Sequence, residues 1–522
     1  MTPIQLNIFA SRVESICDEM GEILKRTALS SNIKDRLDYS CALFDAKGRL
    51  FAQAAHIPVH LGSMAFAMEK IVSSVEWAPG DMVMLNDPFL GGTHLPDITF
   101  IAPLFIAHGP KQQLKAFVVN RAHHANIGAS SPGSMPLSTT LEAEGIIIPP
   151  THIVKNSRLN EARLLEMFCE KDSIEAGARL HILGDFTAQV SANRAGCSGL
   201  ATLIDNMGAE DFESGVRALN DYGRRLAEHT LSAIPDGTYR FTDYMDDDGY
   251  GHTDIPIQCE LRVRASSVIL DFNGTAEQVA GNINCPMSVA AAAVYYVFRC
   301  LMPPQTPACY GTFSAITLEV PEGCLLNADR PAAVASGNVE TSTRVVDVVL
   351  GALAQVLPER IPAASQGSMN NIAMGARGPQ PWDYYETLAG GTGASASGSG
   401  LSALHSHMTN TLNTPVESLE MHYPLMIDRY AIRAGSGGKG ELRGGDGLIR
   451  SYRFLRDTDV TLLTERRRRS PWGLKGGQSG AAGLNTLNGQ ALAGKCQFSA
   501  KTGDVLSIQT PGGGGWGEST ES

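Results

Sequence analysis

Hydrophobic residues recur every three to four positions at the start of the chain, with charged residues between them. This spacing predicts an amphipathic helix over residues 4–29, whose apolar positions are Ile4, Ile8, Val13, Ile16, Met20 and Ile23. The segment CALFDAKGRLFAQ then alternates around residues 45–48, which is typical of a β-hairpin. A second helix is predicted over residues 63–75 and a strand over residues 82–85.

The middle of the chain has a helical pattern throughout. From residue 158 to residue 234, Leu, Ile, Phe and Val recur at helical spacing, with breaks near Ala195-Gly196 and Gly208. The turn Pro235-Asp236-Gly237 ends this segment. Beyond it, the pattern predicts strands within 238–275 and helices over 287–301 and 342–357. Gly/Ser-rich loops with short strands follow Ala363, and the chain closes in a Gly-rich tail, TPGGGGWGEST.

Together these elements favour an α+β fold with several domains, in which mixed sheets flank a helical segment in the middle. No repeat has a fixed period, and 522 residues exceed the length of an ordinary single core. We expect three parts. Residues 1–156 form an α+β part that carries the candidate site, residues 157–235 form the helical segment, and residues 236–522 form a Gly-rich α+β part.

Composition and charge exclude several functional classes. The chain is 43% hydrophobic and 18% charged, as in ordinary soluble globular proteins. Its net charge of −12 argues against unspecific binding to nucleic acid or to anionic lipid. The one basic run, Arg466 to Arg469, is adjacent to Glu465 and close to Pro471, and we expect it on a solvated edge or in a subunit contact.

Cysteine use and hydropathy favour a cytoplasmic protein without a membrane span. No uninterrupted apolar run approaches the length of about eighteen residues that a spanning helix needs. The start of the chain is amphipathic and contains acidic residues, unlike a signal peptide. The ten cysteines are scattered without a C-x-x-C pair, so they predict neither a disulfide framework nor a zinc finger.

Two strand-like runs carry metal-binding types of side chain at their ends. Residues 98–105 follow His94 and Asp97 in NDPFLGGTHLPDITF, and residues 114–120 lead to His123 and His124 in NRAHHANIG. If the two runs pair as antiparallel strands, the imidazoles and the carboxylate converge at one end of the sheet. Imidazole and carboxylate without thiolate suit a divalent ion such as Mn, Fe or Zn, in a catalytic site with open positions.

Other residues offer further ligands or ordinary structural roles. Asp38 in LDYS, Asp87 in the Asn-Asp-Pro turn, and His56 or His60 in HIPVH could each complete the metal shell. Asp87 precedes Pro88 and is equally suited to forming a turn or capping a helix. A lone histidine beside a strand is usually a hydrogen-bonded structural residue, so the prediction rests on the cluster and not on any one member.

No convincing nucleotide site is visible in the sequence. The P-loop pattern and the G-x-S-x-G nucleophile elbow are both absent. The glycine-rich residues 435–440 suit a turn, and DFNGT at residues 271–275 resembles only faintly a phosphate loop of actin-like ATPases, without a matching second half. His405 and His407 have the spacing of one strand face, which allows metal ligation, but structural or interface roles suit them better.

An ordered set of sequence blocks resembles the hydantoinase B/oxoprolinase family. The resemblance extends from near residue 4 to near residue 517, and its blocks are NDPFLGGTHLPDITF, RAHHANIG, PGSMP, EGIIIPP, SGNVETS, PAASQGSMNN, HMTNTLNTPVE and GGDGLIR. Members of this family are metal-bearing subunits or domains of ATP-dependent lactam and hydantoin hydrolases, and relatives are subunits of ketone carboxylases. Their partner is hydantoinase A, an actin-like ATPase subunit that phosphorylates the substrate carbonyl oxygen.

The resemblance implies a function and a set of site residues for this chain. The metal ligands would be Asp38, His94, Asp97 and His123, with His94, Asp97, His123 and His124 as catalytic residues. The block RAHH does not settle which of its two histidines is the ligand. We therefore expect one divalent metal (Zn, Mn or Fe) in a hetero-oligomer with a hydantoinase A-type ATPase subunit, which uses the ATP.

Three functional hypotheses remain open at this point. The first is an ATP-dependent hydrolase of a cyclic amide, of the hydantoin, N-methylhydantoin or 5-oxoproline type. The second is a subunit of an ATP-dependent ketone carboxylase of the acetone or acetophenone type. The third is an assembly protein that has kept the fold and lost the chemistry, against which the intact His94, Asp97 and His123 argue.

Overall fold

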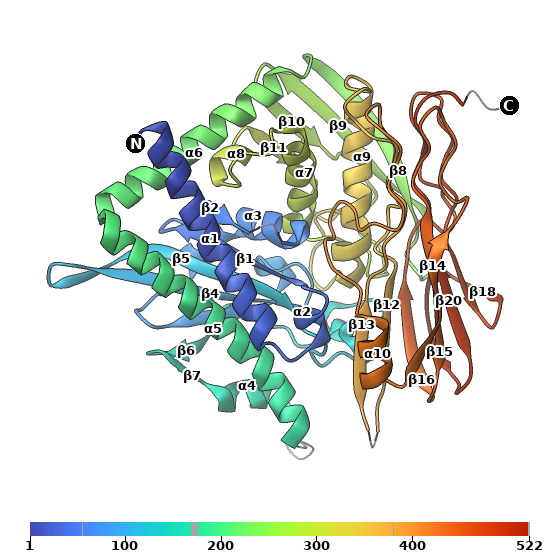
Figure 1. The fold of residues 1–522 in the computed structure, drawn as a ribbon, viewed down its shortest axis with the longest axis horizontal. Helices are drawn as coiled ribbons and strands as arrows, with labels where there is room; N and C mark the ends of the chain where they lie inside the picture. Colours follow the sequence, from blue (N-terminus) through green and yellow to red (C-terminus); the bar gives the residue numbers. More distant parts are fainter. Residues whose placement is uncertain (55, 169–175, 379, 520–522) are drawn as a thin grey trace.

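The structure, a computed structural model, describes residues 1–54, 56–168, 176–378 and 380–519. In these parts of the chain the strands form four sheets, with helices between and around them (Figure 1). The first sheet is antiparallel with seven strands, and the second contains the parallel pair β10–β11 among antiparallel pairs. The predicted α+β fold with several domains and mixed sheets is confirmed by this architecture.

The seven-stranded sheet has the order β2-β1-β5-β4-β3-β6-β7. Its strands are β1 (Tyr39–Asp45), β2 (Leu50–Gln53), β3 (Met82–Leu85), β4 (Asp97–His108), β5 (Lys111–His123), β6 (Thr151–Lys155) and β7 (Arg158–Leu159). The predicted hairpin is β1–β2, and the two runs with metal-type residues at their ends are the neighbouring antiparallel strands β4 and β5. Pairing of these runs is therefore confirmed.

Helices cover both faces of this sheet. α1 (Pro3–Thr27) starts with a capping box, in which Thr2 and Gln5 bond each other's backbone N–H groups. α1 and α5 (Ala176–Met207) share a core with one face of the sheet, to the left in Figure 1. α3 (Pro58–Ser74) packs on the other face and there meets α7 (Met287–Leu301). Both helices predicted in the first 75 residues are thus present.

The helical middle consists of α4 (Glu161–Phe168), α5 and α6 (Ala209–Ser232); residues 169–175 lie outside the described residues. The predicted break at Gly208 is confirmed, since this residue has φ +88° between α5 and α6. The break predicted near Ala195-Gly196 is wrong, because α5 continues through both. A Cβ at Gly196 would lie 2.5 Å from Met20 Sδ and 2.6 Å from Val118 Cγ1, so glycine there permits close packing rather than a helix end.

The second sheet, β11-β10-β9-β8, packs against α7 and α9. Its elements are β8 (Gly237–Asp247), β9 (Thr253–Arg264), β10 (Ser267–Asp271) and β11 (Ile316–Glu319), with a π-helical turn η4 (Gly337–Thr341) before α9 (Ser342–Ala354). The predicted strands and the helix over 287–301 are confirmed, and α9 ends three residues before its predicted end at residue 357. The short helices are α2 (Ser31–Lys34), α8 (Tyr310–Phe313), α10 (Val416–His422), η1 (Pro88–Leu90), η2 (Pro132–Ser134) and η3 (Leu141–Glu144).

Two antiparallel sheets form the C-terminal part, at the right of Figure 1. One contains β12 (Asn371–Ala376), β13 (Trp382–Glu386), β16 (Thr458–Leu463) and β19 (Lys495–Ala500). The other contains β14 (Leu425–Arg433), β15 (Gly447–Phe454), β17 (Leu484–Leu487), β18 (Gln490–Leu492) and β20 (Val505–Gln509). Among the described residues no helix combines the length and the apolar run needed to cross a bilayer. The cytoplasmic location stays a prediction.

Arginine and glycine have roles here that their sequence patterns did not reveal. Arg466 is 1% exposed and its Nη2 donates to Asp243 Oδ2 (2.7 Å) and to Asp347 Oδ2 (2.6 Å), so a solvated edge is the wrong prediction for this residue. The Gly-rich end does not form a free tail either, because residues 511–515 are buried. Gly513 packs so closely that a Cβ there would lie 2.0 Å from the Thr392 carbonyl oxygen.

We expect the substitution Gly513→Ala to destabilise the C-terminal part. The added methyl group would clash with backbone atoms, which cannot make room by changing rotamer as a side chain can. The free energy of unfolding should fall by about 1–3 kcal/mol, the usual cost of overpacking. Urea-induced unfolding measures this change. Gly398→Ala is the matched control, since no atom lies within 4 Å of a Cβ at that position. Equal stability of the two variants would contradict the backbone-to-backbone packing.

Candidate metal centre

Three strand ends meet at one edge of the seven-stranded sheet. Asp38 immediately precedes β1, Asp97 begins β4 and His123 ends β5. The register places Asp97 opposite His123, and the His123 backbone N–H donates to the Asp38 carbonyl oxygen at 3.0 Å. The geometry therefore follows from antiparallel pairing, which brings the start of one strand beside the end of its neighbour.

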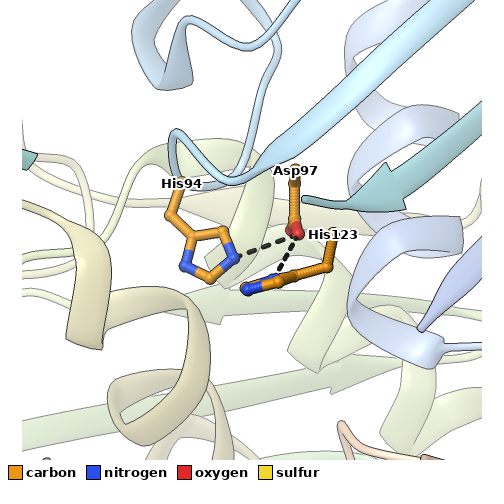
Figure 2. Close-up of side chains that lie close together, drawn as sticks. All are labelled: His94, Asp97 and His123. Carbon is orange, nitrogen blue, oxygen red and sulfur yellow. Dashed lines mark hydrogen bonds and ion pairs between the residues drawn. The ribbon is translucent and has the colours of Figure 1, made fainter. Parts of the chain in front are cut away.

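His94, Asp97 and His123 form a compact buried cluster (Figure 2). Their possible ligand atoms all lie within 4.8 Å of one another. Nε2 of His94 and Nδ1 of His123 are each 3.1 Å from Asp97 Oδ1, and the three side chains are at most 2% exposed. In the described part of the chain this is the one group of three or more such residues with metal-binding spacing.

The loop before β4 holds this cluster in place. Thr93 Oγ1 donates to Asp97 Oδ2 at 2.6 Å, and the His94 carbonyl accepts from the Asp97 N–H at 3.1 Å. Arg121, which is fully buried, donates to the Gly91 carbonyl, to Thr99 Oγ1 and to Ser63 Oγ. One arginine thus ties the loop, the sheet and α3 together beneath the site.

The charges of Asp97 and its histidines depend on one another. Burial alone would raise the pKa of Asp97, but His60, His94 and His123 around it hold that pKa well below its usual range. Burial lowers the pKa of His123 despite the nearby carboxylates. The pKa of His94 is raised, because Asp97 and the Ala335 carbonyl outweigh its burial. A bound cation would replace the proton on His94 beside the charged carboxylate.

The Nε2 atoms of the two histidines are buried and make no hydrogen bond. His94 Nδ1 bonds the Ala335 carbonyl oxygen at 3.2 Å, and His123 Nδ1 bonds Asp97. His94 Nε2 lies 3.1 Å from Asp97 Oδ1, so the two form an ion pair when the ring is protonated. An imidazole with one nitrogen bonded to an oxygen and the other without a hydrogen bond is the usual arrangement of a metal-bound histidine.

Two of the further candidate ligands lie at the edge of the cluster. His60 Nε2 is 3.1 Å from Asp97 Oδ2 and 3.9 Å from Asp38 Oδ1. Asp38 is 6% exposed, and its Oδ2 is 3.7 Å from Nη2 of the buried Arg36. The structure therefore brings Asp38 and His60 next to the three clustered residues.

Strand alternation separates His124 from the cluster. Successive residues of a strand point to opposite faces, so Asp97 and His123 share the face that packs on α3. His124 follows the end of β5; its Nε2 bonds Gln189 Oε1 on α5 at 2.8 Å and its ring stacks on Phe186. The structure does not bring this histidine to the other three.

The remaining candidates lie elsewhere and have structural partners. His56 accepts a hydrogen bond from the Cys41 N–H, and Asp87 caps η1 and pairs with Arg330. His405 is half-buried near Thr409, and His407 Nε2 lies 3.9 Å from Asp347 Oδ1. The segment 271–275 is a turn after β10, in which the Asp271 carboxylate accepts from the Asn273 N–H. The glycines of residues 435–440 include three that pack directly against other backbone.

A small cavity of about 20 Å³ lies beside the cluster, and its lining includes residues that the sequence analysis missed. Tyr385 stacks on His123 with ring centroids 4.7 Å apart, and the Arg36 guanidinium lies over the same Tyr385 ring. Asn338 on η4 reaches Asp97 Oδ2 with its Nδ2 at 3.5 Å. Asn338 lies in the block SGNVETS, which is the only signal in the sequence that could have drawn attention to it.

Comparison with protein families and known sequences gives consistent matches. The model of the family described as hydantoinase B/oxoprolinase matches residues 2–519. An uncharacterized protein of Methanocaldococcus jannaschii is 37% identical over all of this chain and 92% of its own length. 5-Oxoprolinase 1 of Arabidopsis thaliana is 37% identical over 98% of this chain. The chain spans only about two fifths (42%) of that relative.

Two solved structures have the same fold. The ATP-dependent caprolactamase of Pseudomonas jessenii superposes with a TM-score of 0.90 at 26% identity, covering 99% of this chain and 91% of the other. A nucleotide-free acetone carboxylase superposes with a TM-score of 0.87 at 19% identity, covering 99% and 76%. At that identity the second likeness concerns the fold alone.

Proposed function

Because this chain belongs to the hydantoinase B/oxoprolinase family, we propose that it is the metal-bearing subunit of an ATP-dependent hydrolase of cyclic amides. The substrate class is a hydantoin, an N-methylhydantoin or 5-oxoproline. A separate hydantoinase A-type ATPase subunit phosphorylates the carbonyl oxygen of the substrate, and this chain completes the hydrolysis. The observation that carries the proposal is the buried His94–Asp97–His123 cluster beside a small cavity.

The length of the relatives supports a partner subunit. More than half of the Arabidopsis 5-oxoprolinase lies outside its match to this chain, and a caprolactamase described as ATP-dependent superposes on the chain. The described segments 271–275 and 435–440 are turns or packed backbone, which supports an ATP site on another polypeptide. We therefore infer a hetero-oligomer of this chain with the ATPase subunit.

The residues present suit one divalent ion such as Zn, Mn or Fe. Its ligands would be imidazole nitrogens of His94 and His123 and carboxylate oxygens of Asp97 and Asp38. A bound divalent ion would lower the pKa of a water to about 7 and neutralise phosphoryl oxygens. Tyr385 and the Ala335 carbonyl orient the two imidazoles. The apolar walls Val59, Met369 and Met408 limit the access of bulk water.

The proposed reaction consumes one ATP and two water molecules. Phosphorylation converts the cyclic amide into an imidate-like phosphate, whose carbon accepts water more readily than a resonance-stabilised amide. The oxygen of the first water bonds to this carbon. The ring C–N bond then breaks, and the nitrogen leaves as an amine that has taken up the protons of that water. The acyl phosphate that remains reacts with the second water at carbon, which gives the carboxylate and inorganic phosphate.

A ketone carboxylase subunit is the alternative function. Its support is the superposition on acetone carboxylase, which extends over 99% of this chain but at 19% identity indicates only the fold. Identities of 36–37% with proteins named 5-oxoprolinase favour the hydrolase. Ring opening is therefore the reaction that we test first.

The first prediction concerns the metal. His94→Ala and His123→Ala should each lower the affinity for the divalent ion by about 100-fold or more, because losing even an outer-shell partner of a ligand costs 10- to 100-fold. Elemental analysis of purified protein measures the occupancy. His124→Ala is the matched control and should keep its metal, since its ring bonds Gln189. Full occupancy in a folded His94→Ala variant would refute this ligand set.

The second prediction concerns the partner. The isolated chain should show no ATP turnover, and ring opening should appear only after the ATPase subunit is added. Phosphate release, measured with and without the partner, tests both parts of this statement. Steady ATP hydrolysis by the homogeneous chain would mean that an ATP site lies within this chain after all.

The third prediction concerns the fate of oxygen. In oxygen-18 water the new carboxylate should carry label, whereas the released phosphate should take its fourth oxygen from the substrate carbonyl. The reason is that the C–O–P oxygen leaves with phosphorus when water attacks carbon. Mass spectrometry of both products measures this. Labelled phosphate would show that water attacks phosphorus, either of ATP or of the acyl phosphate, and would contradict attack at carbon. Incorporation of labelled bicarbonate into the organic product would favour the carboxylase.

A further inference from the structure

Asn338 presents an unused hydrogen-bond acceptor to the cavity. Three buried polar atoms on the described cavity lining have no hydrogen-bond partner: His94 Nε2, His123 Nε2 and Asn338 Oδ1. The first two are nitrogens that suit a metal ion. The third is an amide oxygen on a side chain that is 2% exposed, and the proposed metal centre gives it no role.

The backbone around Asn338 holds this side chain in a defined position. Gly337 is in contact with the Asn284 backbone, so that a Cβ there would lie 1.8 Å from the Asn284 carbonyl oxygen. The N–H groups of Ser336 and Gly337 both donate to the Asn282 carbonyl, and Ser342 Oγ donates to the Asn338 carbonyl. These bonds fix a π-helical turn at the start of α9, a feature that is frequent at functional sites.

The charge of Asp97 determines which end of the Asn338 amide faces the cavity. Nδ2 lies 3.5 Å from Asp97 Oδ2, where an N–H group is favourable and an oxygen would be repelled. The opposite orientation would bring Oδ1 against the carboxylate. Oδ1 is therefore the atom left toward the cavity, and a buried acceptor without a donor costs free energy until a donor arrives.

Apart from the Asp38 carboxylate, which is a proposed metal ligand, most other walls of the cavity are apolar or already hydrogen-bonded. Val59, Met369 and Met408 are apolar. Thr387 Oγ1 and Thr411 Oγ1 are bonded to each other at 2.8 Å, and Thr387 also accepts from the Arg36 guanidinium. A ligand N–H group that enters this cavity next to the proposed metal ligands can therefore donate to Asn338 Oδ1, an amide oxygen that has no other hydrogen-bond partner.

We propose that Asn338 determines substrate specificity by accepting a hydrogen bond from the N–H group of the scissile amide. This proposal rests on the function proposed above. It adds the residue that makes the enzyme prefer cyclic amides with an N–H group over those alkylated on the ring nitrogen. After O-phosphorylation the ring nitrogen keeps its proton only in the cationic form of the imidate. An acceptor at that N–H stabilises the cationic form, whose carbon is more electrophilic than that of the neutral imidate.

The test compares a five-membered lactam with the same lactam methylated on its ring nitrogen, both hydrolysed by the complex with the ATPase subunit. The wild-type complex should prefer the N–H lactam in kcat/KM. Asn338→Leu, which has a similar volume and no acceptor, should lower this preference roughly 10- to 100-fold, the range for a hydrogen bond to a charged group.

Val339→Ala is the matched control. Val339 also lines the cavity but offers no side-chain hydrogen bond, so its truncation should change kcat/KM for both lactams by a similar factor and leave their ratio unchanged. Elemental analysis of Asn338→Leu provides a readout that is independent of turnover. This variant should retain the divalent ion, because the ligands proposed for it are other residues.

Each outcome decides for or against the proposal. An unchanged preference in Asn338→Leu overturns it, as does loss of the metal from that variant, which would make Asn338 a ligand instead. Equal turnover of both lactams by the wild-type complex overturns the role of Asn338 but leaves the hydrolase function intact. Failure of the wild-type complex to open any cyclic amide overturns the function and this inference together.

Discussion

A carboxylate removed from water requires compensating positive charge or hydrogen-bond donors, and Asp97 at the start of β4 is such a group. It is fully buried, and His60, His94 and His123 surround it together with the Thr93 hydroxyl. Neutral imidazoles alone compensate a charge poorly. A cation beside Asp97, such as the proposed metal ion, would supply that compensation.

This constraint explains why distant parts of the chain converge on one small cavity. The N-terminal sheet supplies Asp38, Asp97 and His123, while η4 supplies Asn338 and β13 supplies Tyr385. The buried Arg36 joins two of these parts, since it approaches Asp38 and donates to the Tyr385 carbonyl. Loss of contact between the N-terminal and C-terminal parts would thus open the site as well as weaken the fold.

The cavity beside the cluster is small, about 20 Å³, which is room for a metal ion or a water and less than a substituted ring occupies. Its lining includes Met408, Thr409 and Thr411, and hydrogen bonds hold this segment to the rest of the chain, from Thr411 to Thr387 and from the Leu412 N–H to the Arg36 carbonyl. A substrate ring would therefore lie partly outside the cavity, with only its reacting atoms beside the cluster.

Local patterns in the sequence determined the elements and half of the site. Alternation in residues 98–105 and 114–120 predicted β4 and β5, and their antiparallel pairing alone brings Asp97 opposite His123. The burial of the Gly-rich end came only from the structure, because a glycine in a free tail and a glycine packed against backbone look the same in sequence. Only the tertiary structure turned His124 toward α5, left Asp87 as a helix cap, and brought Asn338 to Asp97 across 241 residues. The physical reason is that hydrophobic periodicity shows which face of a helix or strand is buried. Which other element covers that face depends on how the layers of the fold pack together.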